Sequence, residues 1–208
     1  MENNIEFSTE QMILKVAQRL FLEKGFALTS TTEIAKAVGC NQALVHYYFR
    51  TKDNLFNTIF EQKFKMFFVS IFETKNMEES SFQDKIKHII EAHFDMVKAN
   101  SKLPLLIINE FSRRPEQVKI LKEKLQPIAE QAFVNLNKEL ENEIDAGRIQ
   151  NVTLIDLMVT LISLNLTLFL LMPLAVEMLT ISDSQKEIMY QHRKSEHIKI
   201  ILNYLRPN

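Results

Sequence analysis

The chain has 208 residues, of which 46% are hydrophobic and 25% are charged, and its formal net charge at pH 7 is −1. This composition is ordinary for a folded globular protein and excludes a largely disordered chain. The single cysteine, Cys40, excludes a disulfide framework and a cysteine-rich metal site. We expect a cytoplasmic location, because the N-terminus lacks the basic and apolar pattern of a secretion signal.

Glycine is scarce in this sequence. The chain holds three glycines, five prolines and no tryptophan. Sandwiches, barrels and doubly wound sheets need many glycine-containing turns, whereas a long helix needs only one stop signal. The composition therefore predicts an all-α fold, and the apolar periodicity along the chain predicts about nine helices.

Three helices are predicted in the first fifty residues. Ser8 or Thr9 can cap the first helix, and Gly25 is placed to end it. Thr31 or Thr32 can cap a short second helix that ends at Gly39. A third short helix fits residues 41–49.

Longer helices are predicted in the rest of the chain. A helix that begins near Asp53 carries phenylalanines at spacings of three and four, and residues 73–81 form a polar linker. A fifth helix fits residues 82–100, and Pro104 and Pro115 mark two further starts. The helix after Pro115 should kink or restart at Pro127, and two last helices fit residues 152–180 and 184–205.

Residues 31–49 have the pattern of a helix-turn-helix, in which two short helices are joined by a turn that contains glycine. On the second of these helices, Val45, Tyr48 and Phe49 share one face and should pack inward. The opposite face is small or polar and carries no acidic residue, as a helix that enters the major groove of DNA requires. That face consists of Gln42, Ala43, His46 and Tyr47.

This segment resembles the N-terminal helix-turn-helix of TetR-family transcriptional regulators, and the resemblance extends over roughly residues 10–60. The pattern is a threonine-capped helix, an Ile-Ala pair, a glycine turn, a short aromatic helix that ends in phenylalanine, and then Lys-acidic-x-Leu. The residues that carry it are Thr31, Thr32, Ile34, Ala35, Gly39, Tyr47, Phe49, Lys52, Asp53 and Leu55.

The resemblance implies which residues touch DNA. They are Thr31, Thr32, Gln42, Ala43, His46, Tyr47, Tyr48 and Lys52. Gln42 can read an adenine edge, and the threonines, Tyr47 and Lys52 can reach phosphate. Two alternatives stay open, because Tyr48 can instead be buried and the threonines can be helix caps only. Residues 28–52 carry Lys36, Arg50 and Lys52 against Glu33, a net charge of +2, so we expect a modest salt dependence.

The resemblance also implies a two-domain architecture. Residues 1–54 would form the DNA-binding domain, and residues 55–208 would form a helical domain for effector binding and dimerisation. The implied protein is a homodimeric repressor that leaves a pseudo-palindromic, inverted-repeat operator when it binds a small, hydrophobic effector. Candidate dimer residues on the last two helices are Leu168, Met172, Ile198 and Leu202.

The stretch 157–176 contains no charged residue and has the length of a membrane span. Polar residues interrupt it, Pro173 lies near its end, and no basic cluster flanks it. A helix that faces both its own core and a partner chain is the favoured explanation, and no membrane association is expected. The alternative is a helical scaffold protein, associated with a membrane through this stretch, that does not read DNA.

Three polar residues on otherwise apolar helix faces are candidates for orienting a ligand: His93, Asn109 and Asn165. Each can equally be a buried group that is satisfied by the protein itself. The histidines are spaced so that no pair shares a helix face closely, and no nucleophile elbow or glycine-rich phosphate loop is present. We therefore expect no metal, no cofactor and no enzymatic activity.

Overall fold

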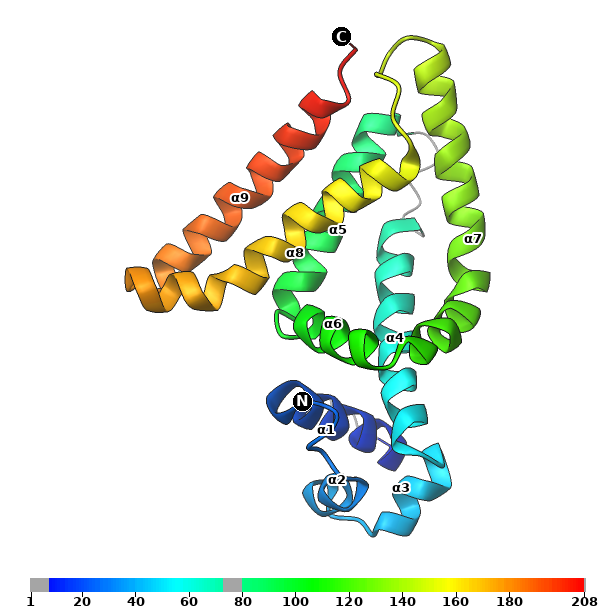
Figure 1. Ribbon diagram of the computed structural model, residues 1–208, viewed down its shortest axis with the longest axis vertical. Helices are drawn as coiled ribbons and strands as arrows, with labels where there is room; N and C mark the ends of the chain where they lie inside the picture. Colours follow the sequence, from blue (N-terminus) through cyan, green and yellow to red (C-terminus); the bar gives the residue numbers. More distant parts are fainter. Residues whose placement is uncertain (1–7, 73–79, 208) are drawn as a thin grey trace, which may run out of the picture. The chain divides into compact units, whose positions relative to one another are not determined.

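The computed structural model describes residues 8–72 and 80–207. Over these two ranges the chain folds into nine α-helices with no β-strand, which confirms the predicted all-α class (Figure 1). The helices are α1 (Thr9–Lys24), α2 (Thr31–Val38), α3 (Gln42–Phe49), α4 (Lys52–Phe72), α5 (Phe82–Ala99), α6 (Leu103–Arg113), α7 (Pro115–Asp145), α8 (Leu154–Leu179) and α9 (Asp183–Tyr204).

The first three helices begin at side-chain caps. Ser8 caps α1 by accepting from the backbone N–H of Gln11, and Asn41 caps α3 in the same way. The cap of α2 is Ser30, so the prediction that Thr31 or Thr32 would serve is wrong by one residue. A consequence is that both threonine hydroxyls are available for other partners.

The later helices agree with the predicted starts except at Pro127. Helix α6 begins one residue before Pro104, and α7 begins at Pro115. Pro127 lies inside α7, which continues from Pro115 to Asp145, so of the two predicted outcomes, a kink or a restart, the restart does not occur. Most of the predicted linker at 73–81 lies outside the described residues.

The chain divides into two compact units. The N-terminal unit comprises the chain up to Phe64 together with Leu105–Lys124, and the C-terminal unit comprises Lys65–Pro104 and Leu125–Asn208. The N-terminal unit therefore contains the first three helices, the first part of α4, most of α6 and the start of α7. The functional boundary between residues 54 and 55 stays a prediction.

Aromatic rings form the core of the N-terminal unit. Phe56 lies between Phe21 and Phe60, with ring centroids 5.5 Å and 4.5 Å away. Phe26, from the loop between α1 and α2, lies 4.9 Å from Phe56 in an edge-on arrangement. All four rings are buried, so α1, α4 and the loop before α2 are held by one cluster.

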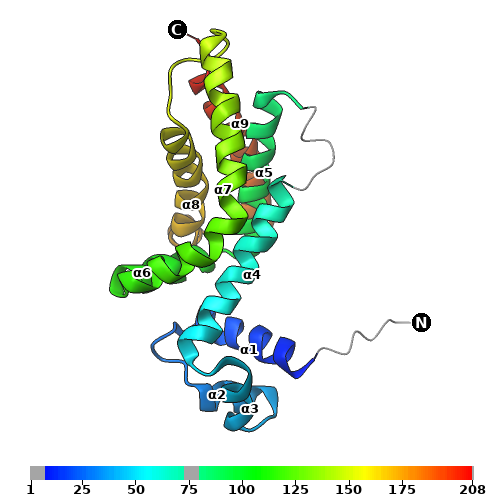
Figure 2. The ribbon, with the colours of Figure 1, turned by 90° about the vertical axis from the view of Figure 1, so that its right-hand side faces the viewer.

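In the C-terminal unit α5, α8 and α9 pack against one another (Figure 2). One buried cluster joins Ile86 and Ile90 of α5 to Leu157 of α8 and Ile201 of α9. A second cluster is built around Phe94 and Phe169. The three helices thereby enclose the polar residues described below.

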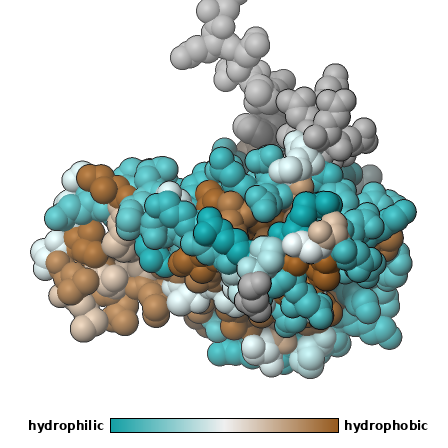
Figure 3. Space-filling view, turned by 90° about the horizontal axis from the view of Figure 1, so that it is seen from above, coloured by the Kyte–Doolittle hydropathy of each residue, from teal (hydrophilic) through white to brown (hydrophobic). Residues whose placement is uncertain are grey.

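Helix α8 is apolar on more than one face. Within the described residues it is the one helix long and apolar enough to cross a membrane, with a mean hydropathy of 2.2 over its most apolar window. Only 28% of that window is buried. Apolar side chains gather at the end where α8 meets α9, on the left of Figure 3. The single chain thus leaves much of α8 uncovered.

The aromatic cluster makes a testable prediction. Phe56→Ala should lower the free energy of unfolding by about 3–5 kcal/mol, because the ring is fully buried and its loss leaves a cavity. Leu28→Ala in the same unit should change it by less than about 0.5 kcal/mol, because Leu28 is 78% exposed. Urea denaturation measures both, and equal effects would contradict the assignment of this core.

Candidate functional site

Helix α3 presents a buried face and an exposed face, as predicted, but the prediction that Tyr48 would pack inward with Val45 and Phe49 is wrong. Val45 and Phe49 are buried against the rest of the N-terminal unit. Gln42, Ala43 and His46 are exposed. Tyr47 is 67% exposed and Tyr48 is 39% exposed, so Tyr48 is not buried. Gln42, His46 and Tyr47 are therefore open to solvent along a face without a carboxylate, and the exposed ring of Tyr48 lies beside that face.

The side chain of Gln42 is tied to the start of α2 by two hydrogen bonds. Its Nε2 donates to Oγ1 of Thr31 at 3.0 Å, and its Oε1 accepts from Oγ1 of Thr32 at 3.0 Å. The structure thus brings three predicted DNA contacts, from two helices, into one cluster. For Gln42 to read a base edge, at least one of these bonds must be exchanged for a bond to DNA.

His46 links this cluster to the end of α3. Its Nδ1 lies 2.9 Å from the carbonyl oxygen of Arg50, and its Nε2 lies 3.2 Å from Nε2 of Gln42. Because a carbonyl only accepts, Nδ1 carries the hydrogen and Nε2 accepts from Gln42. Arg50 has φ 63°, a rare conformation for a residue with a side chain, and His46 holds its carbonyl in place.

The acidic residue of α2 is neutralised within the unit. Glu33 accepts a hydrogen bond from Lys24 of α1, which lowers the pKa of its carboxyl group, and the two form an ion pair. Exposed Lys36 and Arg50 carry no ion pair among the described residues. The surface around α2 and α3 is therefore weakly basic, and the modest salt dependence stays a prediction.

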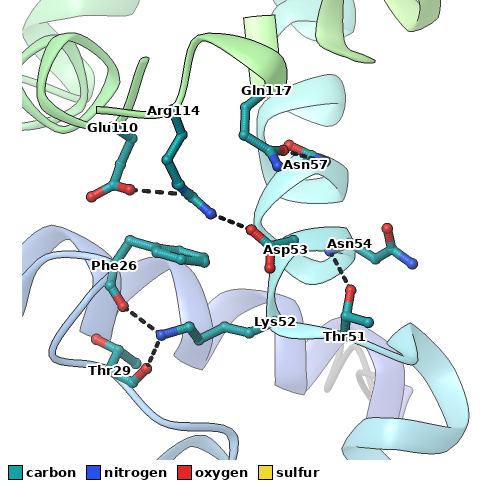
Figure 4. A network of polar contacts seen from close by, with 10 residues as sticks. All are labelled: Phe26, Thr29, Thr51, Lys52, Asp53, Asn54, Asn57, Glu110, Arg114 and Gln117. Carbon is teal, nitrogen blue, oxygen red and sulfur yellow. Dashed lines mark hydrogen bonds and ion pairs between the residues drawn. The ribbon is translucent and has the colours of Figure 1, made fainter. Parts of the chain in front are cut away.

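Lys52 is held by the loop before α2. Its Nζ donates to the carbonyl oxygens of Phe26 and Thr29, both at 2.9 Å, and lies 4.2 Å from the centroid of the Phe26 ring (Figure 4). Two of its three donors are thus used inside the protein. In this structure Lys52 positions the loop that leads into α2, a role that sequence reasoning did not foresee.

A second polar cluster lies in the core of the C-terminal unit. Asn165 is fully buried and donates from Nδ2 to Nδ1 of His93 at 3.0 Å and to the carbonyl oxygen of Ile90 at 3.2 Å. Nδ1 of His197 donates to Oδ1 of Asn165 at 2.8 Å, and Nε2 of His197 accepts from Arg193 at 3.1 Å. His93 and Asn165 are therefore brought together as partners of each other.

Both histidines of this cluster are kept neutral. Burial lowers the pKa of His93 to about 4. Burial, with a smaller contribution from the charge of Arg193, lowers the pKa of His197 to about 4. His197 was missed by sequence reasoning, although its spacing from Ile201 already placed it on the buried face of α9.

Asn109, the third predicted ligand residue, is elsewhere. It is exposed on α6 and belongs to the N-terminal unit, whereas His93 and Asn165 belong to the C-terminal unit. The structure therefore does not join the three residues into one cluster.

An open groove of about 440 Å³ runs between α8 and α9. Its lining residues are Ser163, Leu164, Thr167, Leu168, Leu171, Met172, Ala175, Met189, Arg193 and His197. Of the predicted dimer residues, Met172 is buried in the chain's own core, and Leu168, Ile198 and Leu202 are half-buried. More exposed apolar side chains on the same side are Leu171 and Leu174.

The described part of the chain holds no group of three or more His, Cys, Asp or Glu side chains placed to bind a metal ion. Two clusters of polar side chains contain predicted site residues: the surface cluster of α2 and α3 and the buried cluster around Asn165. The surface cluster is the stronger candidate site, because its groups face solvent.

Comparison with known proteins addresses the helix-turn-helix directly. Residues 13–59 match the family model for bacterial regulatory proteins of the tetR family. The HTH-type transcriptional regulator AcrR of Shigella flexneri is 45% identical over 53 residues, which cover 26% of this chain and 25% of that protein. The Fatty acid metabolism regulator protein of Bacillus subtilis is 22% identical over 138 residues, covering 66% of this chain and 69% of that protein.

Solved structures extend the likeness of the fold to nearly the whole chain. A bacterial regulatory protein in the tetR family from Rhodococcus RHA1 superposes with a TM-score of 0.74 at 15% identity, over 97% of this chain and 99% of that one. The strong sequence match is thus confined to about a quarter of AcrR, while the shared fold includes the C-terminal helices.

The buried histidines predict a dependence of stability on pH. Because their pKa values in the folded chain lie below the unfolded value of about 6.5, the unfolded state takes up protons first as the pH falls. The free energy of unfolding should drop between pH 6.5 and 5 by about 1.5 kcal/mol for each histidine. Below pH 4 this contribution stops changing.

Urea denaturation at a series of pH values measures this slope. His93→Gln should reduce the slope between pH 6.5 and 5, whereas His192→Gln should leave it unchanged, because His192 is exposed on α9. A slope that is the same in all three proteins would contradict the buried, neutral state of His93.

Proposed function

The chain carries the N-terminal domain of the TetR family at residues 13–59, and on this premise we propose that it is a dimeric, sequence-specific regulator of transcription. In this proposal the regulator represses from an inverted-repeat operator, acts in the cytoplasm and has no enzymatic activity. Two copies of α3 enter successive major grooves of the operator.

One observation carries the proposal of DNA binding. The exposed face of α3 offers Gln42, Ala43, His46 and Tyr47 without a carboxylate, and Glu33 of the neighbouring helix is already paired with Lys24. Thr31 and Thr32 lie beside Gln42 at the N-terminus of α2, where the helix dipole favours phosphate. Neutral donors of this kind bind the DNA backbone without a strongly basic surface.

The exposed apolar surface of α8 supports a dimer. We call Leu171, Leu174 and Met178 the distal stripe; they recur at spacings of three and four and are all more than half exposed. On α9, Ile200 and Tyr204 follow Arg193 at seven and eleven residues, so they continue the wall of the groove. A second copy of the chain seated on this side would cover both helices.

A different surface of α8 supports a response to a small molecule. The proximal stripe consists of Ile155, Val159 and Ile162, and it lies roughly 130° around the helix from the distal stripe. A dimer formed through the distal stripe leaves this surface free. We propose that a small apolar effector contacts the proximal stripe and stabilises a conformation with lower affinity for DNA.

Selection of bound duplexes from a random pool, near 0.1 M salt, tests DNA binding. We expect one inverted-repeat motif to be enriched. Tyr47→Ala should then weaken binding to every duplex by about tenfold, because it removes a phosphate contact, whereas Gln42→Ala should change the preferred base at one position of each half-site. Failure of the folded chain to enrich any motif would favour a helical scaffold protein.

A matched control is available on α5. Gln83 is exposed, so Gln83→Ala makes the same chemical change as Gln42→Ala away from the helix-turn-helix. The Gln83→Ala variant should select the same motif as the unaltered chain. It should also bind that motif with the same affinity in a mobility-shift assay. If Gln42→Ala also selects the unaltered motif, Gln42 does not read a base.

The dimer surface can be tested with two separate variants, each of which places one glutamate on one of the two stripes. Leu174→Glu should weaken self-association by about 100-fold or more, because a carboxylate would be buried without a partner twice in the symmetric interface. Ile155→Glu places the same charge on the proximal stripe and should leave the dimer intact. Sedimentation equilibrium measures both, and the reverse result would move the interface to the proximal stripe.

A further inference from the structure

An arginine between α6 and α7 is tied to the start of α4. Nη1 of Arg114 forms an ion pair with Asp53, and Nη2 lies 3.0 Å from the carboxylate of Glu110 (Figure 4). The guanidinium carbon lies 4.0 Å from the centroid of the Phe26 ring. All four residues belong to the N-terminal unit, although Arg114 and Asp53 are 61 positions apart in the sequence.

The arginine is held in a largely buried place. Its side chain is 23% exposed, and the carboxylate of Glu110 is 8% exposed. Nε of Arg114 is buried and has no hydrogen-bond partner in the described residues. Each terminal nitrogen contacts one carboxylate, so the guanidinium compensates the charges of Asp53 and Glu110.

Asp53 follows directly after Lys52, and the hydrogen bonds of Lys52 hold the loop before α2. The ammonium of Lys52 is bound to the carbonyl oxygens of Phe26 and Thr29 and contacts the same Phe26 ring as Arg114. Figure 4 shows the two cations on opposite sides of this ring. A carboxylate without a partner at position 53 would compete with the two carbonyls for Lys52.

We propose that Arg114 is a positioning residue for DNA binding, an inference that rests on the proposed function. By pairing with Asp53 it keeps this carboxylate from Lys52 and from the DNA backbone. Lys52 then holds the loop 26–29, and with it the start of α2 where Thr31 and Thr32 meet Gln42. The DNA-binding unit therefore includes the junction of α6 and α7, outside the matched residues 13–59.

The test measures affinity for the inverted-repeat duplex that the unaltered chain selects. Arg114→Gln should lower this affinity by about fivefold near 0.1 M salt, because Asp53 is no longer compensated. Addition of Asp53→Asn should restore it to within about twofold, because no carboxylate then competes for Lys52. An arginine that only fills space would not be rescued by a change at Asp53, so absence of rescue overturns the proposal.

A matched control lies further along α7. Lys124 pairs with Glu61 of α4 at 2.9 Å, so Lys124→Gln removes the same charge from an ion pair between the same two helical regions. It should change the affinity by less than about twofold. An effect equal to that of Arg114→Gln would overturn the proposal, because the loss would then reflect net charge alone.

Hydrogen exchange gives a readout that does not depend on DNA. The N–H of Thr29 donates to the carbonyl oxygen of Phe26 at 3.3 Å. Its exchange in the free chain should become faster in Arg114→Gln and return to the original rate in the variant with Asp53→Asn. If the unaltered chain selects no duplex, the proposed function fails, while this exchange pattern still decides whether Arg114 positions the loop.

If Arg114→Gln does not fold, the same test can be made in a double variant that also changes Glu110. Because Glu110 is buried and would lose its cation, the pair Glu110→Gln with Arg114→Gln removes both charges and leaves Asp53 as the carboxylate without a partner. The same rescue by Asp53→Asn is expected in this background. Unchanged exchange at Thr29 in this pair would overturn the proposal.

Discussion

The geometry of the N-terminal unit depends on the contacts that the ring of Phe26 makes. It packs edge-on against Phe56 of the aromatic core and lies between the cations of Lys52 and Arg114. Cation–π contacts of this kind gain strength when they are shielded from water, and Phe26 is 7% exposed. One loop residue thus joins the apolar core, the start of α4 and the junction of α6 and α7.

The polar face of α3 is built on this frame by short-range contacts. Gln42 reaches the neighbouring helix and His46 of its own helix, and His46 also reaches the carbonyl oxygen at the end of α3. These bonds fix the side chains before any DNA is present, which reduces the conformational entropy that binding must remove. If Gln42 reads a base as proposed, at least one of these bonds has to be exchanged for a bond to DNA, so preorganisation would carry a cost of reorganisation.

Local signals in the sequence predicted the helices and the exposed face of α3 well. Glycine at 25 and 39 ended two helices, and the spacing of Val45 and Phe49 identified the inward face. The cap of α2 was misplaced because serine and threonine offer the same hydroxyl oxygen, and Ser30 stands directly before Thr31. A kink or a restart was expected at Pro127, and α7 continues through this proline without a restart.

The partners of Lys52, Arg114 and Asn165 could not be predicted in the same way. They depend on contacts between residues that are 23, 61 and 72 positions apart, and no local periodicity encodes such distances. For this reason Lys52 was expected on phosphate, whereas in the structure it binds two carbonyl oxygens. His93 and Asn165 were singled out for their polarity on apolar faces, but only the packed core shows that they bond to each other.

The uncovered surface of α8 has a thermodynamic consequence. A helix whose most apolar window is only 28% buried is not fully stabilised by its own chain. If a second copy supplies the missing contacts, the stability of each subunit is linked by mass action to the total concentration of the chain. The amount of regulator made by a cell would then set how much of it is folded, assembled and able to occupy two half-sites at once.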